Sequence, residues 1–365
     1  MRLCFLHGGF SIHGGIERVL SIVAPALHSS GIAQVRCLAL CDNAPLDMYE
    51  LPEDIALDSL FSQSINMRGA LREGGIFKLV KYLRKNKIDV IVACGVIYYP
   101  LACIGGRLAG AKVVCWEHTN PGKADEVAFE SIGRKFGAIM SHRNVLISQS
   151  AYHYYCNNYR KSRNVVINNP ASDALFKEPC EYDRETHRFI SVGRLTYQKN
   201  YPLLIDIAAR VLADKDDWRW EIYGEGEDRA ELERKIAEKG LQGKVILKGV
   251  ADDLYNRYPQ YAAIVMTSRY EGFPMVLIEA AAKGLPMVSF DIETGPSEII
   301  RDGVNGFLVP GNDVDSMIRK LETLMADSEM RARMSAAAKL SVQPYRVNQI
   351  CEQWRRLFAE MGIYQ

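Results

Sequence analysis

Short apolar segments alternate with amphipathic segments along most of this chain, and this alternation limits the folds that it can adopt. Strands that alternate with helices form parallel sheets covered by helices on both faces. We therefore predict an α/β, doubly wound architecture. The strands expected in the first half are residues 3–7, 34–40, 89–94, 112–116 and 144–147.

The pattern stops and then restarts, which predicts two domains. After Asn168, Asn169 and Pro170 the chain is polar as far as Glu185, and a new apolar run begins at residue 188. A length of 365 residues also favours two domains over one. In such sheets, ligands bind at the carboxyl ends of the strands. The strands expected in the second half are residues 188–192, 219–223, 244–247, 262–267, 286–290 and 306–309.

The composition is that of an ordinary globular protein, with 48% hydrophobic and 24% charged residues. Residues 1–180 hold 20 Lys and Arg against 15 Asp and Glu, which hints at an acidic partner but does not indicate nucleic acid. The nine cysteines include no Cys-x-x-Cys pair, as in reduced, cytosolic proteins. The start of the chain does not resemble a signal peptide, and Gly95 and Pro100 interrupt the uncharged run of residues 90–106. We expect a cytoplasmic protein.

Two carboxylates bracket a predicted helix start in the second half. Glu271 precedes this helix and Glu279 lies within it, while Pro274 suits the first helical position and Gly284 the end. An anionic ligand at this start would meet a positive dipole and free N–H groups, and a carboxylate could hold sugar hydroxyls. The alternative is a solvated helix face. The N–H groups in question belong to Phe273, Met275 and Val276.

Two further segments have the chemistry of a diphosphate site. A strand, Gly8-Gly9 and then Gly14-Gly15 at a helix start would let the backbone approach a phosphate closely, although such a sequence can also be only a turn. Its spacing differs from Gly-x-Gly-x-x-Gly, so a dinucleotide cofactor is not expected. Arg194 and Lys199 follow a strand, where two cations can neutralise a diphosphate, unless they are solvated loop charges.

A histidine and an Asp-x-Asp motif are residue types that can bind metal ions, so each needs to be tested against other roles. His118 follows Glu117 at the end of a strand, where a histidine has either a structural or a catalytic role. Asp313 and Asp315 form an Asp-x-Asp motif that opens a helix, and helix capping explains it better than a metal site. The sequence has no His or Cys cluster with metal-ligand spacing. We expect metal-independent chemistry without a cofactor.

Residues 76–87 combine apolar residues at helical spacing with a strongly basic face that contains Lys78, Lys81, Arg84 and Lys85. The simpler interpretation is a helix packed on the sheet with its charges in solvent. We add the hypothesis that this face contacts anionic lipid or the pyrophosphate of a lipid-linked acceptor.

Taken together, these motifs resemble the retaining glycosyltransferases of the GT-B fold, specifically family 4, whose hallmark is Glu-x7-Glu. The resemblance covers nearly the whole chain, and residues 294–300 look like the bacterial subgroup that builds cell-surface glycans on lipid carriers or lipopolysaccharide. It implies two Rossmann-like domains that face an interdomain cleft: residues 1–175 for the acceptor, 176–343 for the donor, and a helix in 344–365 that crosses back to the first domain. The matching segments are residues 14–19, 117–118, 192–195, 198–200, 223–226, 271–279 and 303–309.

The resemblance also implies an activity and a site. A hexosyl or N-acetylhexosaminyl group would pass from a UDP-sugar to a lipid-linked or lipopolysaccharide glycan with retained anomeric configuration, by an enzyme that is peripheral on the inner face of the plasma membrane. The catalytic residues would be His118 on the acceptor side, Arg194, Lys199 and Glu271. The donor-binding residues would be Gly15, Arg194, Lys199, Glu271, Phe273, Pro274, Met275, Val276 and Glu279, with Glu279 on the ribose. A sugar-nucleotide epimerase or hydrolase, or a non-catalytic sugar-nucleotide-binding protein, remains the alternative.

Overall fold

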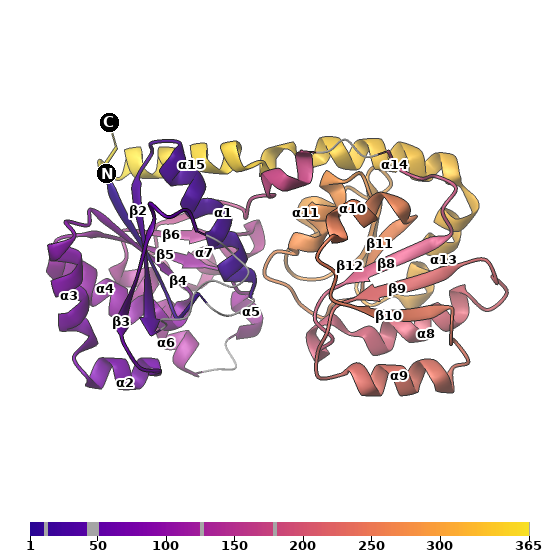
Figure 1. The fold of residues 1–365 in the computed structure, drawn as a ribbon, viewed down its shortest axis with the longest axis horizontal. Helices are drawn as coiled ribbons and strands as arrows, with labels where there is room; N and C mark the ends of the chain where they lie inside the picture. The colour runs from indigo at the N-terminus through magenta and orange to yellow at the C-terminus, as the bar shows by residue number, and fades with distance from the viewer. Residues whose placement is uncertain (11–13, 42–50, 125–127, 178–180, 365) are drawn as a thin grey trace. The chain divides into compact units, whose positions relative to one another are not determined.

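The computed structural model describes residues 1–10, 14–41, 51–124, 128–177 and 181–364. These form two compact units, Met1–Pro170 together with Val347–Gln365, and Ala171–Arg346. Each unit has a parallel sheet with helices on both faces, so the predicted architecture of two Rossmann-like domains is confirmed (Figure 1).

The sheet of the first unit has the strand order β3-β2-β1-β4-β5-β6-β7, and its neighbouring strands pair in parallel. The five predicted strands are present, but β3 and β7 were not predicted. Both of these are edge strands with half-exposed residues, so they lack the continuous apolar run of a buried strand. The strands are β1 Arg2–His7, β2 Gln34–Cys41, β3 Ala56–Phe61, β4 Val90–Cys94, β5 Lys112–Glu117, β6 Arg143–Leu146 and β7 Asn164–Val166.

Helices α3, α4 and α6 of the first unit pack side by side (Figure 1). Leu79 of α3 and Cys103 of α4 are buried in one apolar cluster with Ile91 and Val113 of the sheet. The helices of this unit are α1 Gly15–Ser29, α2 Met67–Arg72, α3 Gly75–Lys85, η1 Val96–Tyr98, α4 Tyr99–Ala109, α5 Pro121–Ala124, α6 Ala128–Met140, α7 Gln149–Asn158 and α15 Val347–Glu360.

Helix α15 follows the whole second unit in sequence, yet it belongs to the first. It packs beside α1, and the fully buried Trp354 lies 5.0 Å from the Trp116 ring of β5 and 6.5 Å from the Phe5 ring of β1. Phe358 extends this aromatic cluster from the next turn of α15. The sequence predicted a helix in this part of the chain, and α15 spans Val347–Glu360.

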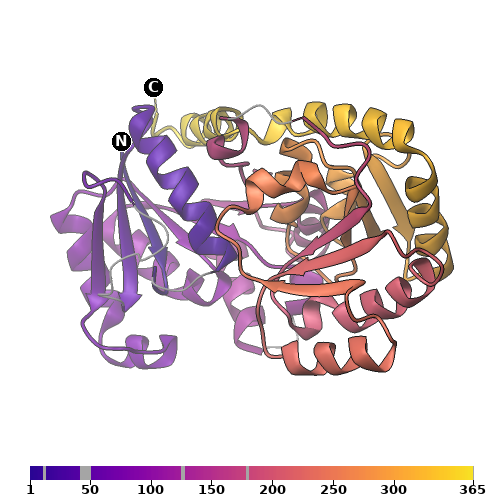
Figure 2. The same ribbon diagram turned by 45° about the vertical axis from the view of Figure 1, so that its right-hand side comes forward.

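The sheet of the second unit has the order β10-β9-β8-β11-β12-β13, and all six strands were predicted. Helices α8 and α9 lie on one side of this sheet and α11 on the other (Figures 1 and 2). The strands are β8 Arg188–Val192, β9 Arg219–Tyr223, β10 Val245–Gly249, β11 Ala263–Met266, β12 Met287–Asp291 and β13 Gly306–Pro310. The helices are η2 Asp173–Phe176, η3 Tyr197–Lys199, α8 Tyr201–Val211, α9 Arg229–Glu238, α10 Leu254–Arg257, η4 Tyr258–Gln260, α11 Met275–Ala282, α12 Pro296–Ile299, α13 Val314–Ala326, α14 Ser328–Ser341 and η5 Gln343–Tyr345.

Several interpretations from the sequence can be compared with this fold. Asp313 caps α13, because its carboxylate accepts a hydrogen bond from the Ser316 N–H at 2.9 Å, as predicted. Among the described residues, no group of three or more His, Cys, Asp or Glu could hold a metal ion. In the same ranges, none of the helices combines the length and apolar content needed to cross a bilayer. The cysteines there are free thiols, and Cys180 lies outside them.

Candidate functional site

The turn after β8 carries the two cations that were predicted for the second unit. Gly193 has φ +153°, and a Cβ atom there would lie 2.7 Å from Cε of Lys199. The N–H of Gly193 donates to the Tyr223 carbonyl at 2.9 Å, so the turn stays attached to β9. Glycine is therefore needed here, because it lets the Lys199 side chain fold back over the end of the strand. Arg194, one residue later, has an exposed side chain.

The segment that holds Lys199 is fastened to the loop after β11. The Arg269 N–H donates to the Gln198 carbonyl at 2.8 Å, and Thr267 Oγ1 donates to the Lys199 carbonyl at 3.1 Å. Gln198 Nε2 donates to the Tyr270 carbonyl at 3.0 Å. Because β8 and β11 are neighbours in the sheet, the two predicted motifs meet at its carboxyl edge.

Lys199 and Glu271 form a salt bridge with Nζ 2.7 Å from Oε1, and their side chains are only 16% and 8% exposed. Gln198 Nε2 donates to the other carboxylate oxygen at 3.3 Å. The ammonium group has three donors, so it can keep Glu271 and still donate to a phosphate oxygen. The salt bridge therefore places a carboxylate that can accept hydrogen bonds from sugar hydroxyls next to an ammonium group that can donate to a phosphate.

Helix α11 begins beside this salt bridge. Pro274 has ψ 90° and is the N-cap residue, so the helix starts at Met275, and the expectation that Pro274 would be its first residue is wrong. Thr294 Oγ1 donates to the Glu271 carbonyl, and Gly295, with φ +99°, packs against the Pro274 ring. These contacts fix the approach to the helix.

The start of α11 keeps free donors. The N–H of Leu277 donates to the Pro274 carbonyl at 3.0 Å. In the described ranges, the N–H groups of Phe273, Met275 and Val276 make no hydrogen bond. Glu279, one of the predicted donor ligands, is buried within α11 and accepts from Tyr258 Oη at 3.4 Å. The helix start therefore offers the N–H groups and the positive dipole that an anion needs.

Gly15 and His118 lie in the first unit, which has its own polar group at the carboxyl edge of the sheet. His7, the last residue of β1, lies with Nδ1 2.8 Å from the Cys94 carbonyl and Nε2 2.9 Å from the Glu17 carboxylate. Both ring nitrogens of this buried histidine therefore lie within hydrogen-bond distance of an oxygen atom. Sequence reasoning missed this buried pair, since Glu17 reads as an ordinary first-turn acid of α1.

The first turn of α1 leaves space beside Gly15. Among the described residues, a Cβ atom on Gly15 would meet no atom within 4 Å, so their packing does not explain the glycine. At Gly14, by contrast, a Cβ atom would lie 2.3 Å from the Glu17 carboxylate. The space beside Gly15 fits the predicted role of presenting its N–H to a phosphate. The residues before Gly14, 11–13, lie outside the described ranges.

His118 follows β5 and packs against Trp116 at a tilt of 48°, with ring centroids 4.3 Å apart. Its Nε2 atom is buried and has no hydrogen-bond partner in the described part of the chain. Burial, with a smaller effect of the charge on His7, lowers the pKa of His118 to about 3. The ring is therefore neutral at physiological pH, and it suits the polar positioning role that the sequence predicted better than that of a charged acid.

The residue before His118 anchors this part of the site. Glu117 is fully buried, and its carboxylate accepts from Arg134 Nε at 3.0 Å, Tyr155 Oη at 2.9 Å and Thr119 Oγ1 at 2.5 Å. Arg134 is also fully buried. Breaking such a pair leaves a charge in the core, so the network fixes the turn that carries His118. Arg134 belongs to α6, and no local pattern connects it with Glu117.

Comparison with known proteins identifies the two units. Residues 13–174 match the family described as Glycosyltransferase Family 4, and residues 176–341 match Glycosyl transferases group 1. The chain belongs to the family 4, group 1 glycosyltransferases. This glycosyltransferase is 26% identical over 363 residues to the amylovoran biosynthesis glycosyltransferase of Erwinia amylovora. The alignment covers 97% of this chain and 98% of that protein.

Other relatives cover most of the chain as well. A lipopolysaccharide 1,6-galactosyltransferase of Escherichia coli K12 is 26% identical over 340 residues, or 89% of each chain. The Anabaena protein HepE, solved in complex with UDP, superposes with a TM-score of 0.84 at 20% identity over 99% of this chain and 100% of that chain. The last comparison supports the GT-B fold of this glycosyltransferase.

Proposed function

We propose that the protein transfers a hexosyl or N-acetylhexosaminyl group from a UDP-sugar to a hydroxyl group of a bacterial surface glycan, with retention of the anomeric configuration. The observation that carries this proposal is the Lys199–Glu271 salt bridge beside the free N–H groups of α11. Relatives support the acceptor class, since they include a lipopolysaccharide galactosyltransferase and a Campylobacter jejuni enzyme named for an undecaprenol-linked glycan. A structural neighbour holds UDP.

The second unit would bind the donor. Lys199, Arg194 and the N–H groups at the start of α11 would stabilise the diphosphate, whose negative charge grows as the bond to the sugar breaks. Glu271 would accept hydrogen bonds from sugar hydroxyls, and Glu279 from the ribose. Gly15 of the first unit would add its N–H to the distal phosphate. These groups are already oriented before the reaction, so they can stabilise the charge on the leaving UDP without reorganising. They therefore favour its departure.

Transfer would then occur on one face of the sugar. The acceptor oxygen forms its bond to the anomeric carbon on the side from which the UDP oxygen leaves, and the proton of the acceptor hydroxyl passes to a phosphate oxygen of the leaving UDP. The neutral His118 ring would contact the acceptor or the reacting sugar through its unpartnered nitrogen. No protein nucleophile is required by this route, and we propose that it needs no metal ion.

The competing functions make different products. A hydrolase would release the sugar from UDP without an acceptor, an epimerase would return an altered UDP-sugar, and a binding protein would do neither. The decisive experiment measures UDP release from a panel of UDP-sugars with and without octyl glycosides as acceptors, in the presence and absence of EDTA. We expect UDP release that depends on the acceptor and persists in EDTA, with retained configuration by NMR. Release at equal rates without any acceptor contradicts transfer.

A further inference from the structure

Two buried tyrosines lie three residues apart in the segment that leads into β11 of the second unit. Tyr258 is the first residue of η4, and Tyr261 directly follows this short helix. Each hydroxyl group donates a hydrogen bond to a buried glutamate. Tyr258 contacts Glu279 of α11, whereas Tyr261 contacts a residue of β9, Glu221. Only the first of these two acids belongs to the predicted donor site.

The backbone that carries Tyr258 is held by hydrogen bonds to the segment before β8. The Pro259 carbonyl accepts from the N–H of Asp183 at 2.9 Å. The Gln260 carbonyl accepts from Thr186 Oγ1 at 2.6 Å. Because the ring of Tyr258 is itself completely buried, both its backbone and its side chain are fixed. A hydroxyl group on such a support can hold a neighbouring side chain in one orientation.

Glu279 lies in the second turn of α11 and is only 2% exposed. Figure 1 shows α10 and α11 together on the side of the sheet opposite α8 and α9, and η4 directly follows α10. Tyr258 Oη donates to Oε2 of Glu279 at 3.4 Å. A carboxylate has about four acceptor positions, so this contact leaves capacity for ribose hydroxyl groups. The phenol also lowers the cost of keeping a buried carboxylate charged before a nucleotide binds.

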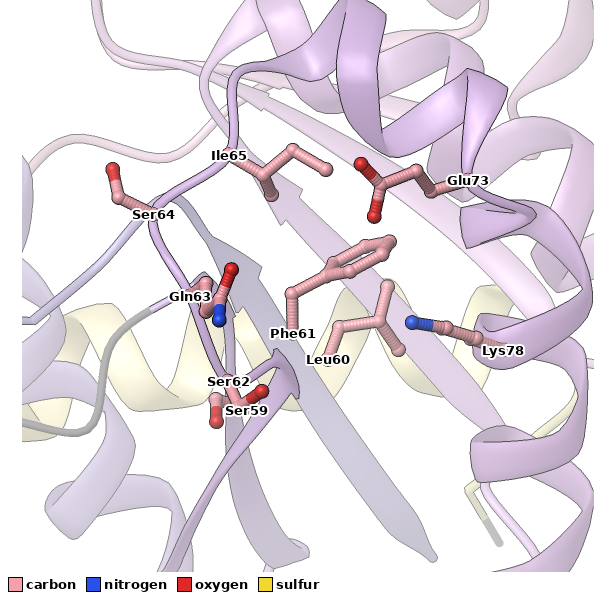
Figure 3. Close-up of a pocket in the computed structure, with 9 residues that line it drawn as sticks. All are labelled: Ser59, Leu60, Phe61, Ser62, Gln63, Ser64, Ile65, Glu73 and Lys78. Carbon is pink, nitrogen blue, oxygen red and sulfur yellow. The ribbon is translucent and has the colours of Figure 1, made fainter.

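An exposed acid of the first unit illustrates why a buried one needs a protein donor. Figure 3 shows Glu73 at the edge of a cavity that also has Phe61 and Lys78 in its lining, and Glu73 is exposed. Water can solvate such a carboxylate in several rotamers. Glu279 has almost no access to water, so it depends on protein donors for both its charge and its orientation.

Tyr261 provides a matched contact outside the predicted donor site. Its hydroxyl group donates to Glu221 Oε2 at 2.6 Å, and the Tyr223 hydroxyl group donates to the same oxygen at 3.0 Å. Glu221 is 7% exposed, so this carboxylate is also buried. Neither Glu221 nor Tyr261 was predicted to bind the donor. The general effect of losing a buried hydroxyl group can therefore be separated from loss of the contact with Glu279.

We propose that Tyr258 is a positioning residue for the nucleotide, because its hydroxyl group holds the Glu279 carboxylate in the orientation that accepts from the ribose hydroxyl groups of UDP. This role rests on the proposed donor site and adds a residue that acts through Glu279. Discrimination between ribose and deoxyribose then depends on Tyr258, since a site built to bond a hydroxyl group rejects the analogue that lacks it. Affinity for the other parts of UDP does not depend on it.

Two phenylalanine variants each remove one hydroxyl group and keep the ring. Tyr258→Phe is the test, Tyr261→Phe is the matched control, and Glu279→Ala is the reference that lacks the carboxylate. The double variant of Tyr258→Phe with Glu279→Ala completes a thermodynamic cycle, which isolates the coupling between the two side chains. Circular dichroism and urea unfolding establish that each variant is folded and how much stability each hydroxyl group contributes.

The first measurement is the Kd for UDP, 2′-deoxy-UDP and 3′-deoxy-UDP by calorimetry, without an acceptor. We expect wild type and Tyr261→Phe to bind at least one deoxy analogue about ten-fold more weakly than UDP. In Tyr258→Phe this ratio should fall below about three, because UDP binds more weakly while the Kd for that analogue changes little. The ratio should be about one in Glu279→Ala, and adding Tyr258→Phe should not change it further.

The possible results of this measurement distinguish the positioning role from the proposed function. A ratio in Tyr258→Phe equal to that of wild type overturns the positioning role. An equal fall of the ratio in Tyr261→Phe also overturns it, because the cause is then a general loosening of the core. Wild type that binds UDP without ribose discrimination overturns the positioning role and leaves the proposed transfer intact. Wild type that does not bind UDP refutes the proposed function and the positioning role together.

The second measurement is steady-state transfer from a UDP-sugar to an octyl glycoside. A ribose contact is similar in the ground and transition states, so its loss should affect donor binding and not the chemical step. Tyr258→Phe should therefore raise KM for the UDP-sugar about three- to ten-fold and change kcat by less than about two-fold. Tyr261→Phe should leave both constants close to those of wild type. A lower kcat with unchanged KM in Tyr258→Phe overturns the assignment of this residue to the ribose contact.

Discussion

At the scale of residues, Lys199 and Arg194 were predicted for the same task, yet Lys199 is paired with Glu271 whereas the side chain of Arg194 is exposed. Lys199→Ala leaves the largely buried Glu271 carboxylate without its cation, so it should lower the free energy of unfolding by about 1–3 kcal/mol. It should also raise the barrier to transfer by about 2–4 kcal/mol. Arg194→Ala should slow transfer without changing stability, because its side chain is exposed. Urea unfolding and kcat/KM of both variants provide the comparison, and equal stability losses would be inconsistent with this structure.

The two carboxylates should also separate in kinetic measurements. Glu271 lies beside the phosphate-binding lysine and Glu279 lies within α11, so they should contact different parts of the donor. Glu271→Ala should lower kcat and weaken the choice among UDP-sugars. Glu279→Ala should chiefly raise the Kd for UDP, since a ribose contact is similar in the ground and transition states. Identical kinetic profiles across several UDP-sugars would show that this division is wrong.

His118 should make stability depend on pH in a defined direction. Its pKa is about 3 in the folded protein against an ordinary value of 6.5, so the unfolded chain binds more protons between these values. The stabilising contribution is complete above pH 6.5 and decreases as the pH falls toward 3, by at most about 1.4 kcal/mol per pH unit. His118→Gln should therefore lose less stability than wild type between pH 7 and pH 5. Parallel stability curves for the two proteins in urea would contradict the low pKa.

Particular residues show how much of the site could be predicted from the sequence. Lys199 and Glu271 were selected from their motifs, but their salt bridge depends on the adjacency of β8 and β11, which local patterns do not encode. The same holds for Arg134, whose partner Glu117 lies on a different element. The residue types at strand ends can be identified from the sequence. Which of them form pairs between loops can be predicted only when the strand order of the folded sheet is known.

At the scale of elements, every predicted strand is present, but the edge strands β3 and β7 of the first unit were not predicted. In β3 only the last residue is fully buried, so its sequence lacks the apolar run that identified β4 or β5. The start of α11 was misplaced by one residue for a different reason. Pro274 suits either the N-cap or the first turn, and contacts with Thr294 and Gly295 decide between them.

Gly295 should control the geometry of the α11 start. A Cβ atom there would lie 2.3 Å from Cδ of Pro274, in a backbone conformation with φ +99°. Gly303→Ala is the matched control, because Gly303 has φ +72° but a Cβ atom there would meet none of the described residues within 4 Å. We expect Gly295→Ala to raise the Kd for UDP several-fold and to cost about 1–3 kcal/mol of stability, and Gly303→Ala only the backbone strain of about 1 kcal/mol. Equal UDP affinity in both variants would exclude a role of the Pro274 contact.

At the scale of the whole molecule, the chain divides into two units with separate cores, and Trp354 is part of the core of the first unit. Trp354→Ala should leave a cavity beside Phe5 and Trp116 and destabilise this unit by about 3–5 kcal/mol. Hydrogen exchange should become faster in peptides from β1, β5 and α1. Peptides from β8 and β13 serve as the internal reference and should be unchanged. Uniformly faster exchange across both units would indicate that they unfold as one.

The position of α15 has a consequence for how the protein is made. Ribosomes synthesise a chain from its amino terminus, and domains usually fold in that order. Here Phe5 and Trp116 emerge early, but Trp354 is added only after every strand of the second unit has been synthesised. The aromatic surface of Phe5 and Trp116 in the nascent first unit therefore stays uncovered by Trp354 while the second unit is synthesised and folds. Its completion is therefore a late event, and a chaperone that binds aromatic side chains would have its longest opportunity before it.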